Sequence, residues 1–256
     1  MRPAHLLLAV AVAGCQFEHG AVGDRHDGDI DAADDAPVID PTPDTRVIPY
    51  CDPLDPDIVA CYPFEDSTLD ATLHHLDATM TNVSFVAGKV GNAMLFDTTS
   101  AADVGDSTLW DVGALTIEAW IKPSQLPATG TRMGILDMNG QYGFFLHETG
   151  RLQCTIVGGI TAQVDAGVTT TEWSHVACTY DGATTTIYRN GSIVFQGGGG
   201  GAIATGGATG ISIAADNPPN SGSRLLGLID EVRILSRART TAEICADAGA
   251  CPPAMP

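Results

Sequence analysis

The chain has little positive charge. Its 256 residues contain 12 Lys and Arg against 31 Asp and Glu, a formal net charge of −19. The lysines are Lys89 and Lys122 alone, and no basic run occurs. Nucleic-acid-binding proteins hold the phosphate backbone with clustered cations, and acidic membranes attract similar clusters. The composition therefore argues against a nucleic-acid partner and against direct binding to acidic lipids.

Charged and aromatic residues are also scarce, at 17% and 6% of the chain, whereas Gly and Pro number 29 and 15. A helical bundle is rich in charged helix formers and poor in these two turn residues. The hydrophobic fraction of 44% is too high for a wholly disordered chain. We therefore expect a turn-rich β protein.

The first residues resemble a lipoprotein signal peptide, assigned to residues 1–14. Arg2 precedes an apolar stretch from Leu6 to Ala13, and Val12-Ala13-Gly14-Cys15 resembles the lipobox of bacterial lipoproteins. In such proteins the chain is cut before the cysteine, which then carries the lipid. The apolar stretch is too short to span a bilayer core of about 30 Å. We predict an exported protein with a membrane anchor at Cys15; an ordinary secretory signal is the alternative.

Gln16 follows this cysteine. By resemblance to the enterobacterial sorting rule, a residue other than Asp at this position favours the outer membrane, with the protein facing the periplasm or the cell surface. Residues 15–49 are rich in acids and prolines and almost free of aromatics. Such a segment buries too little apolar surface to offset its ordering entropy, so we expect a disordered acidic tether. One folded domain is expected over residues 50–256.

Six cysteines remain once Cys15 is assigned to the lipid, and six can pair completely. Their spacing favours Cys51 with Cys61 and Cys245 with Cys251, which leaves Cys154 with Cys178. The last two are expected to point into the core and to bond only if their strands are neighbours. Structural zinc is the alternative, but there is no C-x2-C pair and exported proteins favour disulfides.

Short alternating apolar runs separated by turns occur between Val59 and Arg239 and predict an all-β fold, a two-sheet antiparallel sandwich. Asn190-Gly191 predicts a two-residue hairpin turn, because both central residues of a type I′ turn need positive φ. Near the C-terminus, Thr240 and Glu243 fit the capping box of one short helix.

Four sequence blocks carry a resemblance to a known family. In chain order they are Phe85-Val86-Ala87-Gly88-Lys89-Val90-Gly91-Asn92-Ala93, Thr116-Ile117-Glu118-Ala119-Trp120-Ile121-Lys122-Pro123, Trp173-Ser174-His175-Val176-Ala177-Cys178-Thr179-Tyr180-Asp181-Gly182 and Gly227-Leu228-Ile229-Asp230-Glu231-Val232-Arg233-Ile234. The chain from Tyr62 to Ile244 resembles the laminin G-like jelly-roll family of the concanavalin A-like lectin/glucanase superfamily. The resemblance implies a jelly-roll sandwich.

The family resemblance also implies a non-catalytic binding module that recognises carbohydrate or a surface protein. A structural or protein-interaction role in the envelope is the alternative. The E-x-D-x-x-E arrangement of the superfamily's glycosidases is absent. A glycosidase is therefore the least favoured hypothesis. It would require Asp137, Glu148 or Glu172 to lie within about 5.5 Å of another acid in a cleft.

Similar jelly rolls often hold one calcium ion at the edge of the sandwich, between acids near the first and last strands. The resemblance assigns this metal site to Glu65, Asp66, Asp70 and Asp230, because Ca²⁺ prefers several oxygen ligands. The alternative is that Asp230 accepts turn or backbone hydrogen bonds and that the other three are solvated loop acids.

The three tryptophans divide by context. Trp120 and Trp173 lie within apolar runs and are expected in the core. Trp110 lies in a polar segment, where an exposed indole would stack on a sugar ring; the alternative is a partly buried loop anchor. Trp110 is the ligand-binding residue that the sequence suggests.

Overall fold

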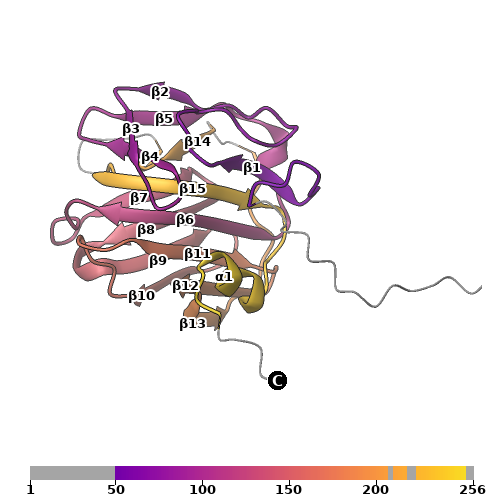
Figure 1. The fold of residues 1–256 in the computed structure, drawn as a ribbon. Coiled ribbons are helices and arrows are strands. Elements are labelled where there is room, and N and C mark those ends of the chain that lie inside the picture. Colours follow the sequence, from indigo (N-terminus) through magenta and orange to yellow (C-terminus); the bar gives the residue numbers. More distant parts are fainter. Residues whose placement is uncertain (1–49, 207–209, 218–222, 252–256) are drawn as a thin grey trace, which may run out of the picture. The chain divides into compact units, whose positions relative to one another are not determined.

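The protein folds as two antiparallel β-sheets packed face to face, with a short helix near the C-terminus (Figure 1). This computed structural model describes residues 50–206, 210–217 and 223–251. The predicted all-β sandwich is confirmed. The expected signal peptide, the tether and Cys15 lie outside the described residues. In the described part, no helix is long and apolar enough to cross a membrane.

Each sheet combines hairpin-connected strands that follow one another in sequence with strands from distant parts of the chain. Sheet A has the order β13-β12-β11-β6-β15-β4-β3, with β1 also paired to β15; sheet B has the order β10-β9-β8-β7-β14-β5-β2. The strands of sheet A are β1 (Ile58–Tyr62), β3 (Ser84–Ala87), β4 (Asn92–Phe96), β6 (Leu115–Pro123), β11 (Ser174–Tyr180), β12 (Thr184–Arg189), β13 (Ser192–Gly198) and β15 (Gly227–Leu235). Those of sheet B are β2 (Thr79–Thr81), β5 (Ala101–Val104), β7 (Arg132–Met138), β8 (Tyr142–His147), β9 (Arg151–Ile156), β10 (Thr161–Asp165) and β14 (Ile211–Ile213).

The inner faces of the two sheets form one apolar core. Alternate residues of each strand point inward, as in Ile117, Ala119 and Ile121 of β6. Facing them from β8 are Phe144 and Leu146, which are fully buried. The period-two pattern in the sequence therefore identifies the core side of both strands correctly.

Local signals also place the turns and the helix. Asn190 and Gly191 have φ of 48° and 76°, and they join β12 to β13 as the hairpin prediction requires. The helix α1 spans Thr241–Asp247, with Thr240 as N-cap and Glu243 completing the capping box. Both predictions are confirmed.

The cysteines join in the three pairs that their spacing favours, Cys51–Cys61, Cys154–Cys178 and Cys245–Cys251. The expectation that Cys154 and Cys178 bond only if their strands are neighbours was wrong. Cys154 lies on β9 of sheet B and Cys178 on β11 of sheet A, so their strands are not neighbours. Inward residues of packed sheets face each other, and this bond crosses the core between them.

The helix α1 covers the part of the outer face of sheet A that β11 and β12 form. Ile244 of the helix packs on Ala177 of β11 and Tyr188 of β12 (Figure 1). Beneath this covered face lies Glu118, which is fully buried and pairs with Arg233 and Arg239. Burial opposes its ionisation, but contact with His175 and the charges of these two arginines lower the pKa of Glu118 to about 2.

Trp120 is buried as predicted, although on the outer face of sheet A, whereas Trp173 departs from the core prediction. Trp120 is only 7% exposed, but it alternates with the core residues of β6 and so lies on the outer face of sheet A. There it makes an edge contact with His175, and the Lys89 ammonium lies 4.4 Å from its ring centre. Trp173 is partly exposed and precedes β11. Neighbours on the outer face of sheet A, and not the opposite sheet, therefore bury Trp120.

The two ends of the domain meet at one arginine. Arg233 of β15 donates to the Tyr50 carbonyl at 2.5 Å and pairs with Asp247 at the end of α1. Its guanidinium also lies 3.8 Å from the centre of the Tyr50 ring. Since β1 pairs directly with β15, the first and last segments of the domain lie side by side.

We predict that the inter-sheet disulfide makes a large contribution to stability. A Cys154→Ala/Cys178→Ala double variant should lose about 3 kcal/mol of unfolding free energy in urea, because the bond closes a 24-residue separation and links both sheets. A Cys245→Ala/Cys251→Ala variant is the control and should lose less, since its loop is shorter. Equal stability of the first variant and the unmodified protein would contradict the prediction.

A candidate ligand-binding pocket

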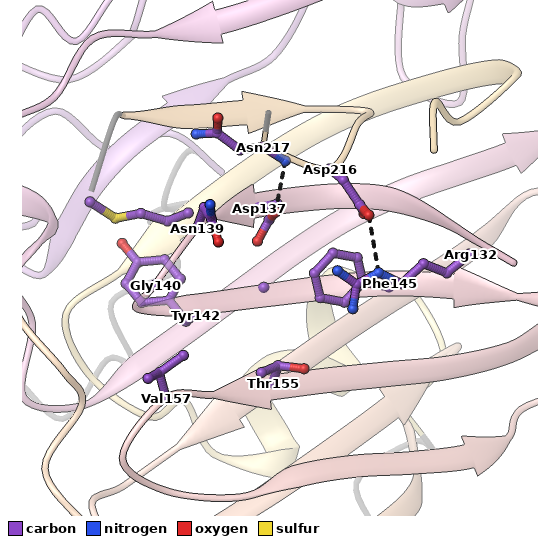
Figure 2. A pocket seen from close by; sticks show the side chains of 12 residues that line it. Arg132, Asp137, Asn139, Gly140, Tyr142, Phe145, Thr155, Val157, Asp216 and Asn217 are labelled. Carbon is purple, nitrogen blue, oxygen red and sulfur yellow. Dashed lines mark hydrogen bonds and ion pairs between the residues drawn. The ribbon is translucent and has the colours of Figure 1, made fainter. Parts of the chain in front are cut away.

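A pocket of about 430 Å³ opens on the outer face of sheet B (Figure 2). It lies over β7, β8 and β9 and is bordered by the segment that follows β14. Its lining residues are Arg132, Asp137, Met138, Asn139, Gly140, Tyr142, Gly143, Phe145, Thr155, Val157, Asp216 and Asn217. Polar and charged side chains thus surround a small aromatic area.

A β-bulge in β7 directs Asp137 into this pocket. Gly134 is paired with Phe145 and Leu136 with Phe144, so Ile135 is an extra residue on β7. Ile135 and Leu136 consequently both belong to the core. The bulge shifts the alternation by one residue, and Asp137 then points outward instead of inward.

The segment after β14 crosses β7 at Gly134. The Gly134 amide donates to the Ser223 carbonyl, and the Ala214 amide donates to the Ile135 carbonyl. A Cβ atom at residue 134 would lie 2.1 Å from the Ala215 carbonyl group, so the crossing requires glycine. This close approach places Asp216 and Asn217 beside Asp137.

A second strand glycine shapes the floor of the pocket. Gly143 faces outward next to Asp137 on β7, and a Cβ atom there would lie 2.4 Å from the Phe145 ring and 2.7 Å from Asp137 Oδ1. The missing side chain lets the ring and the carboxylate lie close to the sheet. Arg132 stacks on Phe145 at 3.8 Å and pairs through Nε with Asp216 Oδ2 at 3.1 Å (Figure 2).

The two carboxylates in the pocket differ in their partners. Asp216 is paired with Arg132. Asp137 is only 6% exposed, and its Oδ2 accepts the Asn217 amide at 2.7 Å (Figure 2). Burial raises the pKa of Asp137 to about 6, and the charge of Asp216 acts in the same direction. Burial also raises the pKa of Asp216. The pocket therefore holds one carboxylate whose charge is poorly compensated.

This arrangement can bind a polar ligand in several ways. Asp137 accepts hydrogen bonds, Asn139 has an amide side chain that donates and accepts, and Thr155 has a hydroxyl group. The Asn217 side chain also lines the pocket, where its Nδ2 donates to the Gly210 carbonyl. Convergent groups of this kind around a small apolar area are typical of sites for ligands rich in hydroxyl groups. The pocket has the composition of a small-molecule or glycan site.

Among these residues the sequence indicates only Asp137 as a candidate, and only for the glycosidase hypothesis. The prediction from sequence missed Arg132, Phe145, Asp216 and Asn217. The available signal was glycine inside strands: Gly134 and Gly143 interrupt apolar runs at positions where another backbone or side chain approaches closely.

Trp110 does not form the exposed platform that its polar neighbours suggested. It is fully buried, and its indole N–H donates to the Gly105 carbonyl at 3.1 Å. The Tyr142 hydroxyl also donates to the Trp110 carbonyl. Apolar burial outweighs the polar sequence context, and Trp110 is a buried anchor with no ring face open to a ligand.

The four proposed calcium ligands do not converge. The Asp70 oxygens accept from the Cys61, Thr72 and Leu76 amides and from the Thr72 hydroxyl, so this side chain holds its own loop and is not a solvated acid. Asp66 is exposed. Among the described residues there is no group of three or more His, Cys, Asp or Glu that could hold a metal.

Two of these acids do meet at one turn. Glu65 accepts the Asn92 amide, and buried Asp230 accepts the Lys89 and Val90 amides at 2.8 and 3.0 Å. Burial raises the pKa of Asp230 to about 6, and Glu65 contributes to the shift. Hydrogen bonding to the turn is thus the observed role of Asp230, and these side chains do not fit the four-residue calcium site.

The acids named in the glycosidase hypothesis are separated in the structure. Glu148 pairs with Arg151 at 2.7 Å, and Glu172 is exposed. Asp137 alone lies in the pocket, where Asp216 is the second acid.

Comparison with solved structures shows the same fold in several binding domains. Domain 4 of AbnA, a GH43 extracellular arabinanase from Geobacillus stearothermophilus in complex with arabinotriose, has a TM-score of 0.63 and 22% identity over 75% of this chain and 98% of that domain. The binding domain of Paraclostridial Mosquitocidal Protein 1 has a TM-score of 0.62 and 15% identity over 78% of this chain and 52% of its own.

A third similar structure is the binding domain of botulinum neurotoxin DC in complex with SialylT, with a TM-score of 0.56 and 12% identity. The match covers 75% of this chain and 50% of that domain, so this chain spans about half the length of the two toxin domains. A search of curated proteins finds no match.

A family model supports the assignment at the level of sequence. The laminin G-type model described as the concanavalin A-like lectin/glucanases superfamily matches residues 96–245, more than half of the chain. The sandwich topology agrees with this match. The chain therefore belongs to the laminin G-type family of the concanavalin A-like lectin/glucanase superfamily.

Proposed function

We propose that this protein is an exported, lipid-anchored binding module that recognises carbohydrate through the pocket on sheet B. The observation that carries the proposal is the convergence of Asp137, Asn139, Thr155 and Asn217 on one pocket in the outer face of a jelly-roll sheet. Carboxylate, amide and hydroxyl groups in such an arrangement are suited to the paired hydroxyl groups of a sugar ring.

The opposite outer face is less available. On sheet A, α1 covers β11 and β12, and the charges of Glu118, Arg233 and Arg239 neutralise one another below it. The arabinotriose and SialylT complexes of similar domains are consistent with a glycan-binding role. A structural or protein-interaction role in the envelope is the alternative if no glycan binds.

A glycosidase is the second candidate, because Asp137 and Asp216 line the same pocket and burial raises the pKa of both. Acid catalysis by a carboxyl group needs such a shift. We propose binding without hydrolysis because the superfamily's paired-acid motif is absent from the sequence. Release of reducing ends from any glycan that binds would favour the enzyme instead.

Export is supported by the three disulfides, which are typical of oxidising compartments. The proposed lipid on Cys15 would tether the domain to a membrane through residues 15–49, with the outer membrane as the proposed location. A Ca²⁺ ion at Glu65 and Asp230 would also need oxygen ligands from water and from the backbone of residues 88–92, because Ca²⁺ takes six to eight oxygens.

The first test is a glycan array that includes bacterial envelope polysaccharides, probed with residues 50–256 in the presence and absence of Ca²⁺. We expect binding to a defined glycan class, and loss of at least tenfold in affinity when Thr155→Trp fills the pocket. Gln163→Trp is the matched control, because Gln163 is exposed on the same face but does not line the pocket.

If both tryptophan variants still bound the glycan, the binding site would have to lie elsewhere on the domain. No binding by the folded protein would favour the protein-interaction role. A rise in melting temperature with Ca²⁺ that Asp230→Asn removes would support the ion at the turn.

We predict that the ionised form of Asp137 lowers the unfolding free energy of the domain. Its pKa of about 6 is above that of a free aspartate, so the folded state loses stability as pH rises from about 4 to about 6. Asp137→Asn should therefore raise the unfolding free energy by about 1 to 3 kcal/mol near neutral pH and by much less near pH 4. Asp165→Asn, an exposed control, should change it by less than about 0.5 kcal/mol at both. A loss of stability in Asp137→Asn would show instead that the carboxylate is structural.

Lipidation is tested with the full chain in a bacterial host. We expect incorporation of a labelled fatty acid and recovery of the protein in the membrane fraction. Cys15→Ser should abolish both, because the thiol is the attachment point. Cys251→Ser, a control at the C-terminal end of the sequence, should retain the label. A labelled Cys15→Ser variant would place the lipid elsewhere.

A further inference from the structure

Asp137 is a buried carboxylate that lines the pocket but has no ion-pair partner among the described residues. No Lys, Arg or His of the described ranges forms an ion pair with it, and its Oδ2 accepts a hydrogen bond from the Asn217 backbone amide. Taking an ionised carboxylate out of water is costly unless a charge or several hydrogen bonds replace the lost hydration. A site of this kind is incomplete without a ligand that supplies them.

The neighbouring groups do not supply that charge. Arg132 is the cation in the pocket, and it is held by Asp216 and by the face of the Phe145 ring. On the neighbouring strand, Ser212 lies opposite Asp137, but its hydroxyl donates to Asp103 at 2.6 Å. Arg132 and the Ser212 hydroxyl are thus both engaged by acids other than Asp137.

Two acids lie near Asp137 on this face, and Arg132 is the cation that lines the pocket with them. Asp216 lines the same pocket, and Asp103 lies on β5 across β14 from Asp137. The chain as a whole carries a formal charge of −19. Such a field repels anionic ligands and attracts cationic ones.

We propose that the pocket selects glycans that carry a free amino group, with the protonated amine bound at Asp137. This inference rests on the carbohydrate-binding role proposed above and names the ligand class. An ammonium group supplies both the missing positive charge and hydrogen-bond donors, and charge-assisted hydrogen bonds are stronger than those of a neutral hydroxyl. The Asn139 amide group and the Thr155 hydroxyl can then contact the hydroxyl groups of the same sugar.

Charge complementarity at one carboxylate also explains why a metal is a poor occupant. Asp137 has one oxygen engaged by a backbone amide, and Asp216 is paired with Arg132. Calcium requires six to eight oxygen ligands, and no cluster of three or more acidic, His or Cys residues occurs in the described ranges. A single ammonium group needs fewer ligands.

The test compares β-1,4-linked glucosamine oligomers with N-acetylglucosamine oligomers of equal length, titrated into residues 50–256 by calorimetry near neutral pH. The two probes share a backbone and differ in the charge of the amine. We expect the free-amine oligomer to bind at least tenfold more tightly. Asp137→Asn should remove most of that preference, because the amide carries no charge to pair with the ammonium group.

The control is Asp165→Asn, which removes one exposed negative charge from the same sheet face outside the pocket. This variant should keep the preference, because general attraction of a polycation to an acidic protein does not depend on one residue. An equal loss in both variants would overturn the inference and leave only nonspecific attraction.

Other outcomes separate this inference from the role on which it rests. The amine inference would be overturned if the two oligomers bound equally, or if neutral or acetylated glycans bound more tightly. If Thr155→Trp also blocked that binding, the result would still support carbohydrate binding at the pocket. Absence of binding to any glycan by the folded protein would overturn both.

Discussion

The apolar layer between the two sheets fixes the position of every other feature. Once the inner faces are buried against each other, the alternation of side chains along each strand decides which residues reach solvent. The Cys154–Cys178 bond ties the two layers together through this core. Functional groups are therefore confined to outward positions, and a pocket forms only where those positions are brought close by a second segment of the chain.

The sequence predicts most of the fold because its signals there are local. Alternation along β6 and β8 identifies their inner faces, Asn190-Gly191 specifies the hairpin through positive φ, and the Thr240 and Glu243 capping box specifies where α1 begins. The cysteine spacing also favours the observed pairs. The expectation that Cys154 and Cys178 bond only from neighbouring strands was wrong. A sequence indicates that a side chain points into the core but not which sheet its strand joins.

The pocket could not be predicted in the same way. Asp137 points outward because of a bulge at Ile135, and this depends on how β7 registers with β8. Asp216 reaches the pocket because a distant segment crosses Gly134. Trp110 shows the opposite error: polar neighbours in sequence suggested exposure, yet packing buries the ring completely. Contacts between distant segments decide each case, and strand glycines were the remaining sequence clue.

The shared contact of Tyr50 and Asp247 with Arg233 brings the two ends of the domain together. Because β1 pairs with β15, the first and last strands of the domain are neighbours in one sheet. Domains whose ends lie close tolerate circular permutation and insertion into a loop of another protein. This domain is thus suited to transplantation between unrelated polypeptides, and new ends could be opened in a surface turn such as that between β12 and β13 with a short linker joining the old ones.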